Sequence, residues 1–178
     1  MIYKHLLAQY ECEQIAEIES CDDNRPVCSF GYGGERLAFY LRHIGSALAG
    51  GTVTEVNHLV EASRLIMFGF CGSLDRTGTD GRFIIPTQAY RGEGLSFYFA
   101  KAQRLFQNKN TEVMENIFSE RKIPFITDRV WTTDSMLCET VNLVNRHRQD
   151  GCIAVEMEIT GVQASDLSYM FFCLPAMF

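Results

Sequence analysis

Two glutamates flank a methionine near the end of the chain, where "GCIAVEMEITGVQA" covers residues 151–164. The residues before them form a short apolar run that predicts a buried strand. Strand alternation then sends Glu156 and Glu158 to one side and Met157 to the other. Two nearby carboxylates can accept hydrogen bonds from the vicinal hydroxyls of a sugar, and a methionine offers a polarizable surface to a ring. The alternative is that these acids only cap the following helix or pair with a basic residue.

An α/β domain with a largely parallel or mixed sheet must position this strand end. The continuous apolar runs that predict strands are residues 64–70, 82–90, 123–133 and 152–158. The segments whose spacing predicts helices are residues 46–63, 110–122, 135–151 and the stretch from 159. Ligands gather at the carboxyl ends of the strands in such sheets, so the two glutamates stand where a binding site is expected.

Other local patterns predict a helix, a hairpin and helix ends. Apolar residues recur with helical spacing over residues 2–18. The stretches 25–30 and 36–44 flank the turn "GYGG" and predict a β-hairpin. Ser135 is the expected cap of the helix that begins there, and Gly151 is its expected stop. Pro86 is expected to mark the end or an edge of its strand.

Composition restricts the classes of function. The 22 acidic and 16 basic residues give a net charge of −6, and without a clustered basic stretch this argues against a nucleic-acid partner. No apolar run reaches the roughly 18 residues that a membrane helix needs, and no signal peptide is recognisable. The seven scattered cysteines predict free thiols in a reducing cytoplasm, and the four histidines have no spacing that suggests a metal site. We therefore expect one cytoplasmic domain over residues 1–178, without metal.

The segment with the two glutamates resembles the "VEMEaa" motif of the purine nucleoside and uridine phosphorylase family, which includes the methylthioadenosine and adenosylhomocysteine nucleosidases. Two other segments resemble motifs of this family and occur in its order. They are "LIMFGFCGSLDRTGTDGRFIIPTQAYRGEG" and "RVWTTDSMLCETV". The resemblance extends from about Val27 to Ala164. It implies a three-layer αβα sandwich with a mixed central sheet, assembled into dimers and often hexamers.

The resemblance also implies a reaction and a ligand. Members of the family attack the C1′ carbon of a nucleoside, with phosphate in the phosphorylases and with water in the nucleosidases. Inorganic phosphate is thus a possible co-substrate, and no other cofactor is implied. By its place in the motif, Glu158 is expected to bind the ribose hydroxyls. Met157 is expected to pack on the sugar, and Glu156 to lie beside the base or the ribose. Met136 falls near the place where the family often carries an aromatic side chain under the base.

Other matched positions belong to a loop and to a phosphate site. Arg91, Glu93 and Ser96 match the family's "RxEGxS" loop, which lies near the nucleoside pocket, and Arg91 is therefore expected among the substrate-binding residues. Arg25 loosely matches the arginine that reaches the phosphate of a neighbouring subunit. The partner implied is a nucleoside bound by a homo-oligomer.

Three positions depart from the family's pattern. Phe70 stands in place of a small hydroxyl residue in the phosphate turn, and Met67 stands in place of a phosphate-binding arginine. Cys138 replaces the arginine of the "RET" motif. Losing such contacts should weaken phosphate binding by several kcal/mol, taking roughly 1.5–3 kcal/mol for each hydrogen bond to a charged group. The alternative function is a catalytically degenerate nucleoside-binding or assembly protein of the same fold.

Both ends depart from the family as well. Nothing before Ile2 resembles its first strand and phosphate loop, and nothing after Ala164 resembles the segment that carries the acid for the leaving base. Asp166 is expected to be an acid on a helix surface, so the catalytic acid is unassigned. The chain is then either a divergent relative or a shortened copy of an active one. The apolar residues 169–178 are expected to cover the sheet or to enter an oligomer interface.

Overall fold

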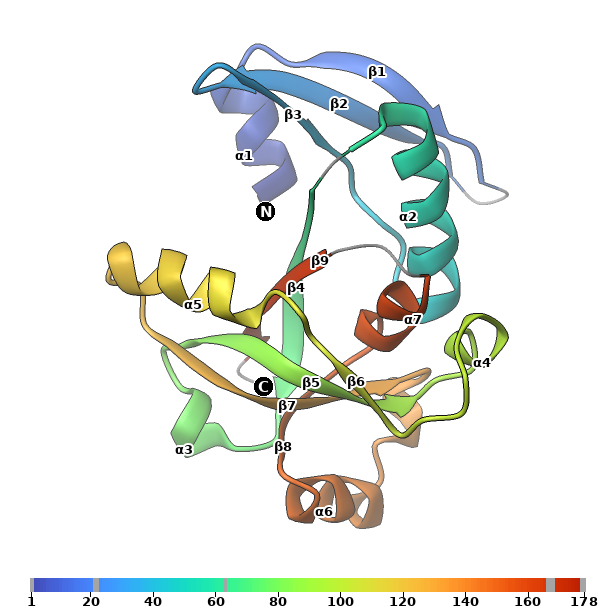
Figure 1. Ribbon diagram of the computed structural model, residues 1–178, viewed down its shortest axis with the longest axis vertical. Coiled ribbons are helices and arrows are strands. Elements are labelled where there is room, and N and C mark those ends of the chain that lie inside the picture. The colour runs from blue at the N-terminus through green and yellow to red at the C-terminus, as the bar shows by residue number, and fades with distance from the viewer. Residues whose placement is uncertain (1, 21–22, 63, 166–168, 177–178) are drawn as a thin grey trace. The chain divides into compact units, whose positions relative to one another are not determined.

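The computed structural model describes residues 2–20, 23–62, 64–165 and 169–176. The chain forms two compact units. The N-terminal unit consists of Met1–His43 and Gly51–Ala62, and the C-terminal unit consists of Ile44–Gly50 and Ser63–Phe178. Helix α2 (Ser46–Val60) contributes residues to both units, and Figure 1 labels the elements along the chain. Within the described ranges, no helix is long and apolar enough to cross a membrane.

The N-terminal unit contains a three-stranded antiparallel sheet in the order β1-β2-β3. Its elements are α1 (Ile2–Gln9), β1 (Glu13–Ile18), β2 (Arg25–Tyr32) and β3 (Glu35–Phe39). The predicted hairpin is confirmed, and Gly33 and Gly34 take the positive φ angles of its turn, 61° and 85°. The predicted helix over residues 2–18 is wrong beyond Gln9. The later residues pair with β2, and Ile18 packs on Val27 and Val56, so burial overrides the helical spacing.

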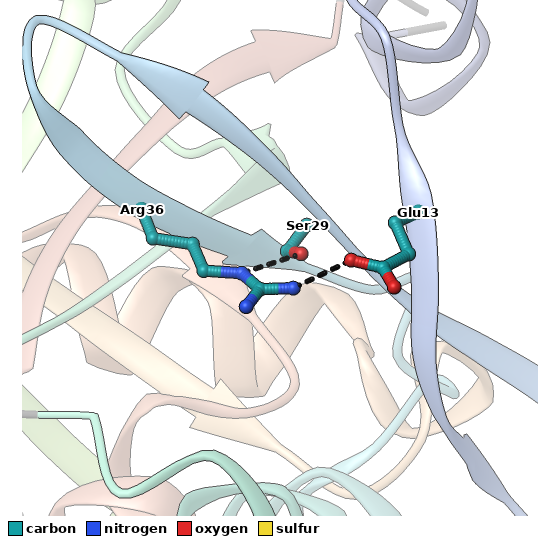
Figure 2. A network of polar contacts seen from close by, with 3 residues as sticks. All are labelled: Glu13, Ser29 and Arg36. Atoms are coloured by element: carbon teal, nitrogen blue, oxygen red, sulfur yellow. Dashed lines mark hydrogen bonds and ion pairs between the residues drawn. The ribbon is translucent and has the colours of Figure 1, made fainter.

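One polar network joins all three strands of this sheet (Figure 2). The Nη2 atom of Arg36 on β3 lies 2.8 Å from Oε2 of Glu13 on β1, and its Nε donates to Oγ of Ser29 on β2 over 3.0 Å. The charged side chains are largely exposed, so the ion pair contributes only about 0.2–1 kcal/mol to stability. The network therefore supports the register of the strands more than it stabilises the unit.

The C-terminal unit contains a six-stranded mixed sheet in the order β6-β5-β7-β8-β4-β9. Its strands are β4 (Leu65–Ser73), β5 (Phe83–Gly92), β6 (Leu105–Gln107), β7 (Phe125–Thr133), β8 (Cys152–Glu156) and β9 (Tyr169–Ala176). Strands β5, β7 and β8 are parallel neighbours, and β9 runs parallel to β4. Strand β9 also pairs with β5 at Ile84 and Cys173, which connects one side of the sheet back to the other. Residues 169–176, expected to cover the sheet, are thus a strand within it.

Helices flank this sheet on both faces, which confirms the predicted α/β class. The helices are α3 (Arg76–Thr79), α4 (Ser96–Phe99), α5 (Thr111–Glu120), the 3-10 helix η1 (Met136–Cys138), α6 (Val141–Gln149) and α7 (Ile159–Ala164). Helix α6 lies on the opposite side of the parallel strands from α5 and α7 (Figure 1).

Two details differ from the predicted boundaries. The helix expected from Ser135 is interrupted, because Ser135 caps only η1 and Thr140 caps α6 by accepting a hydrogen bond from the amide of Leu143. Gly151, with a φ of 83°, ends α6 as predicted. Pro86 does not end β5, since the strand continues past it through a register shift.

A histidine lies in the core between α6 and the sheet. The ring of His147 stacks on Trp131 with centroids 4.1 Å apart and meets the ring of Tyr90 edge-on at 4.5 Å. Its Nδ1 atom has no hydrogen-bond partner among the described residues. Burial lowers the pKa of His147, because the charged imidazolium would lose its hydration there.

Replacing His147 with phenylalanine is expected to make the protein less sensitive to acid. The pKa of His147 is lower in the folded chain than in the unfolded chain, so the unfolded chain binds more protons as the pH falls below about 6.5. The wild-type free energy of unfolding therefore loses this contribution on acidification, and that of H147F does not. Urea unfolding at pH 7.5 and pH 5.5 measures the difference, and equal losses in both proteins would contradict it.

Candidate functional site

Buried polar side chains gather where the parallel strands β5, β7 and β8 end. Gly92 of β5 lies in register with Thr133 of β7, and Thr132 lies in register with Glu156 of β8. The loop after β5 leads to α4 and the end of β8 leads to α7, and these two helices pack together (Figure 1). The buried polar residues at this edge are Arg91, Glu93, Ser96, Thr132, Thr133, Glu156, Glu158 and Thr160. They form the candidate site, since buried polar groups require partners.

Glu156 uses its carboxylate inside the protein. One oxygen accepts a short hydrogen bond from the hydroxyl of Thr132. The other accepts from the backbone amides of Glu158 and Ile159 over 2.7 and 2.8 Å. These amides open helix α7, so Glu156 caps this helix. For this glutamate the structure agrees with the alternative that the sequence left open, a helix-capping acid.

The environment of Glu156 changes its acidity. Burial raises its pKa to about 7, and the nearby charge of Glu158 acts in the same direction. The hydrogen bonds from Thr132 and the two amides favour the charged form and oppose this rise. A carboxyl group with a pKa near neutrality therefore lies directly beneath the first turn of α7.

Glu158 is held by the start of α2. It is 5% exposed, and its Oε1 atom accepts a hydrogen bond of 2.8 Å from the amide of Gly45. The hydroxyl of Ser46 donates to the carbonyl oxygen of Met157 over 2.9 Å. Gly45 has a φ of 96°, a conformation that glycine adopts without strain. The close packing extends to Gly161, where an added Cβ would lie 2.6 Å from the Cβ of Ser46.

These contacts fix the backbone on both sides of Glu158 and leave the Met157 side chain half-buried. The three residues of the "EME" motif therefore have separate surroundings. Glu156 points beneath α7, Glu158 toward Gly45, and Met157 retains partial exposure. The binding roles of the three residues stay predictions.

Arg91 organises the loop that follows β5. Its Nε donates to Oγ of Ser96 over 2.6 Å, and its Nη1 donates to the carbonyl oxygens of Lys101 and Gln103 over 3.0 and 3.4 Å. The guanidinium carbon lies 3.6 Å from the ring centroid of Phe97, a cation–π contact. Arg91, near the end of β5, is thus buried against residues of the following loop, and its contact with a nucleoside stays a prediction.

The remaining predicted binding residues are not among the buried polar residues of this cluster. Met136 is in η1 with 66% of its surface exposed. Arg25 belongs to the N-terminal unit, where its Nε donates to Nε2 of His43 over 3.0 Å and its Nη1 donates to the carbonyl oxygen of Leu41 over 3.4 Å. Asp166 lies outside the described residues.

The three residues that replace the family's phosphate-binding residues have no positively charged side chain. Phe70 on β4 is 75% exposed, Met67 on the same strand is half-buried, and Cys138 in η1 is exposed. Among the described residues, no cluster of three histidine, cysteine, aspartate or glutamate side chains could hold a metal ion.

Sequence reasoning missed several residues of the cluster. Thr132 and Thr160 lie within the quoted motifs, and their hydroxyl groups at a strand end and in a buried helix turn were an available signal. Gly45 and Ser46 contact the "EME" segment across more than a hundred residues of chain, and no local pattern indicates this.

Comparison with known proteins identifies a family and solved structures that are similar to this chain. The sequence profile of the phosphorylase superfamily matches residues 5–163, whereas a search of curated proteins finds no match. The solved structure of a uridine phosphorylase from Vibrio fischeri ES114 is similar with a TM-score of 0.83 and 16% identity, over 99% of this chain and 74% of that one. An AMP nucleosidase from Bacteroides thetaiotaomicron VPI-5482 is similar with a TM-score of 0.73 and 21% identity, over 86% of this chain and 68% of that one.

Proposed function

We propose, from the premise that this chain belongs to the phosphorylase superfamily, that it binds a ribonucleoside and acts on its N-glycosidic bond. The solved structures that resemble it are named for reactions of uridine and of AMP, which supports a nucleoside or nucleotide as the substrate class. Inorganic phosphate is the proposed co-substrate. We further propose a cytoplasmic homo-oligomer, as the family resemblance implies.

The observation that carries this proposal is the buried carboxylate of Glu158 at the end of β8. A carboxylate held in place by the Gly45 amide would accept hydrogen bonds from the ribose hydroxyls. As the glycosidic bond breaks, positive charge develops on the sugar, and a fixed negative charge nearby stabilises it. Met157 would contact the face of the ribose, consistent with its partial exposure.

A second candidate function is nucleoside binding without cleavage. It is supported by Met67, Phe70 and Cys138, none of which can supply a positive charge to a phosphate. A protein that retains the sugar contacts and lacks the phosphate contacts would bind a nucleoside and leave its glycosidic bond intact. The proposed Arg25 contact with phosphate from a second subunit would reduce this deficit.

The test combines binding and turnover. Purified protein is titrated calorimetrically with uridine, adenosine and AMP, and base release is followed by chromatography with and without inorganic phosphate. We expect binding of at least one ribonucleoside and release of its base at high enzyme concentration. Binding without release supports the second candidate, and release only with phosphate identifies the co-substrate. The absence of binding and release with all three compounds would contradict both functions.

A further inference from the structure

We infer that Glu93 is a positioning residue that connects the loop after β5 to the helix holding Glu158. This inference rests on the proposed function, because it assigns Glu93 a role in orienting the carboxylate that would bind ribose. The loop in question covers residues 93–104 and includes α4. Neither Glu93 nor its partner on α7 has a part in the binding roles proposed above.

The carboxylate of Glu93 accepts hydrogen bonds from two elements. It is 3% exposed, and its Oε2 accepts from the amide of Ser96 over 3.0 Å. Its Oε1 accepts a short hydrogen bond from the Ser96 hydroxyl and a second bond of 2.9 Å from the hydroxyl of Thr160 on α7. Since Ser96 also accepts from Nε of Arg91, its hydroxyl hydrogen is directed at Glu93 and the polarity of the network is determined.

A second series of hydrogen bonds leads from Thr160 to Glu158. The amide of Thr160 donates to the hydroxyl oxygen of Thr132 over 3.3 Å. The Thr132 hydroxyl donates to Glu156, whose other oxygen holds the amide of Glu158. The side chain of Thr160 is therefore bonded to the loop. Its backbone is bonded to Thr132, which in turn donates to the carboxylate of Glu156 that holds the amide of Glu158.

The three hydroxyl groups in this network are fully buried, so each of them requires a hydrogen-bond partner inside the protein. Thr132, Thr160 and Ser96 are each 0% exposed, so a hydroxyl there is costly unless it is bonded. Threonine also has a lower helix propensity than many alternatives, and valine would fill the same volume without a polar atom. The Thr160 hydroxyl thus gives α7 a directional contact with Glu93, and this contact limits how α7 can rotate or shift against the loop.

The experiment compares Thr160→Val, which removes only the hydroxyl, with Thr160→Ser, which retains it. We expect T160V to weaken binding of the ribonucleoside identified above, tested as uridine, adenosine and AMP, by about five- to tenfold, and T160S to remain within about twofold of wild type. The amide hydrogens of Glu158 and Ile159 are expected to exchange faster in T160V than in T160S. This second measurement needs no ligand.

A double-mutant cycle with Glu158→Gln separates positioning from general destabilisation. If Thr160 acts through Glu158, T160V adds no further loss of binding in the E158Q background. An equal loss in both backgrounds, or wild-type exchange of both amides in T160V, would overturn the positioning role. Unchanged binding in E158Q itself would instead overturn the proposed ribose contact, and this inference with it.

Discussion

Replacing Glu158 with glutamine is expected to weaken ribonucleoside binding by about 10- to 100-fold, since hydrogen bonds to a charged group contribute roughly 1.5–3 kcal/mol. The glutamine carbonyl can still accept the amide of Gly45, so the local backbone is retained. What the substitution removes is a charged acceptor for the ribose hydroxyls. Calorimetric titration with uridine, adenosine and AMP measures the effect.

Two controls make this expectation specific. Glu120→Gln removes a negative charge from an exposed position at the end of α5 and should leave binding unchanged. The 2′-deoxynucleosides lack one of the hydroxyl donors, so wild type should prefer the ribonucleoside more strongly than E158Q does. The same preference in both proteins would show that Glu158 does not contact the sugar.

Replacing Glu156 with glutamine is expected to change how stability depends on pH. The pKa of Glu156 is about 7 in the folded chain, against an ordinary value of 4.5, so the folded chain binds more protons than the unfolded chain between these values. This group's contribution to stability is therefore fully present below about pH 4.5 and is lost as the pH rises through 7. The loss amounts to about 3 kcal/mol at pH 8, and E156Q should not show it.

Urea unfolding at pH 5, 6, 7 and 8 tests this expectation through the slope of the free energy of unfolding. The absolute stability of E156Q is less informative, because the amide changes the hydrogen bond with Thr132. His147 acts in the opposite direction, because its contribution to stability falls on acidification. The wild-type free energy of unfolding is therefore expected to change little with pH. Introducing E156Q should expose the acid sensitivity due to His147. Parallel profiles for wild type and E156Q would contradict the role given to Glu156.

Local patterns were sufficient to predict much of the C-terminal unit. The apolar runs at residues 64–70 and 123–133 were predicted as strands and form β4 and β7. Strand β4 is nevertheless not covered on both faces, because its side chains alternate between half-buried and exposed up to Phe70. Helical spacing predicted α1 but failed beyond Gln9, where residues 13–18 pair with β2. Helical spacing also did not indicate the interruption before Thr140. There the 3-10 helix η1 ends, and the Thr140 side chain caps the separate helix α6.

The candidate site was predictable only in part. The "VEME" motif located the strand end and its two carboxylates, but sequence alone could not separate their surroundings. Glu156 accepts from the amides of the residues two and three positions ahead, which converge on its carboxylate only when α7 has formed. Glu158 accepts from Gly45, which is 113 residues away in sequence. Contacts of this kind depend on tertiary structure, so no local pattern distinguishes a capping glutamate from a binding one.

The position of β9 has a consequence for synthesis of the protein. Strand β4 is made early, yet its parallel neighbour begins at Tyr169, which pairs with Leu65. Until residues 169–176 have left the ribosome, β4 lacks the partner along most of its length, and β5 lacks the pairing at Ile84. An apolar strand edge without its partner is prone to associate with other chains. The nascent protein is therefore expected to be prone to aggregation from the time β4 has been made until residues 169–176 have followed it.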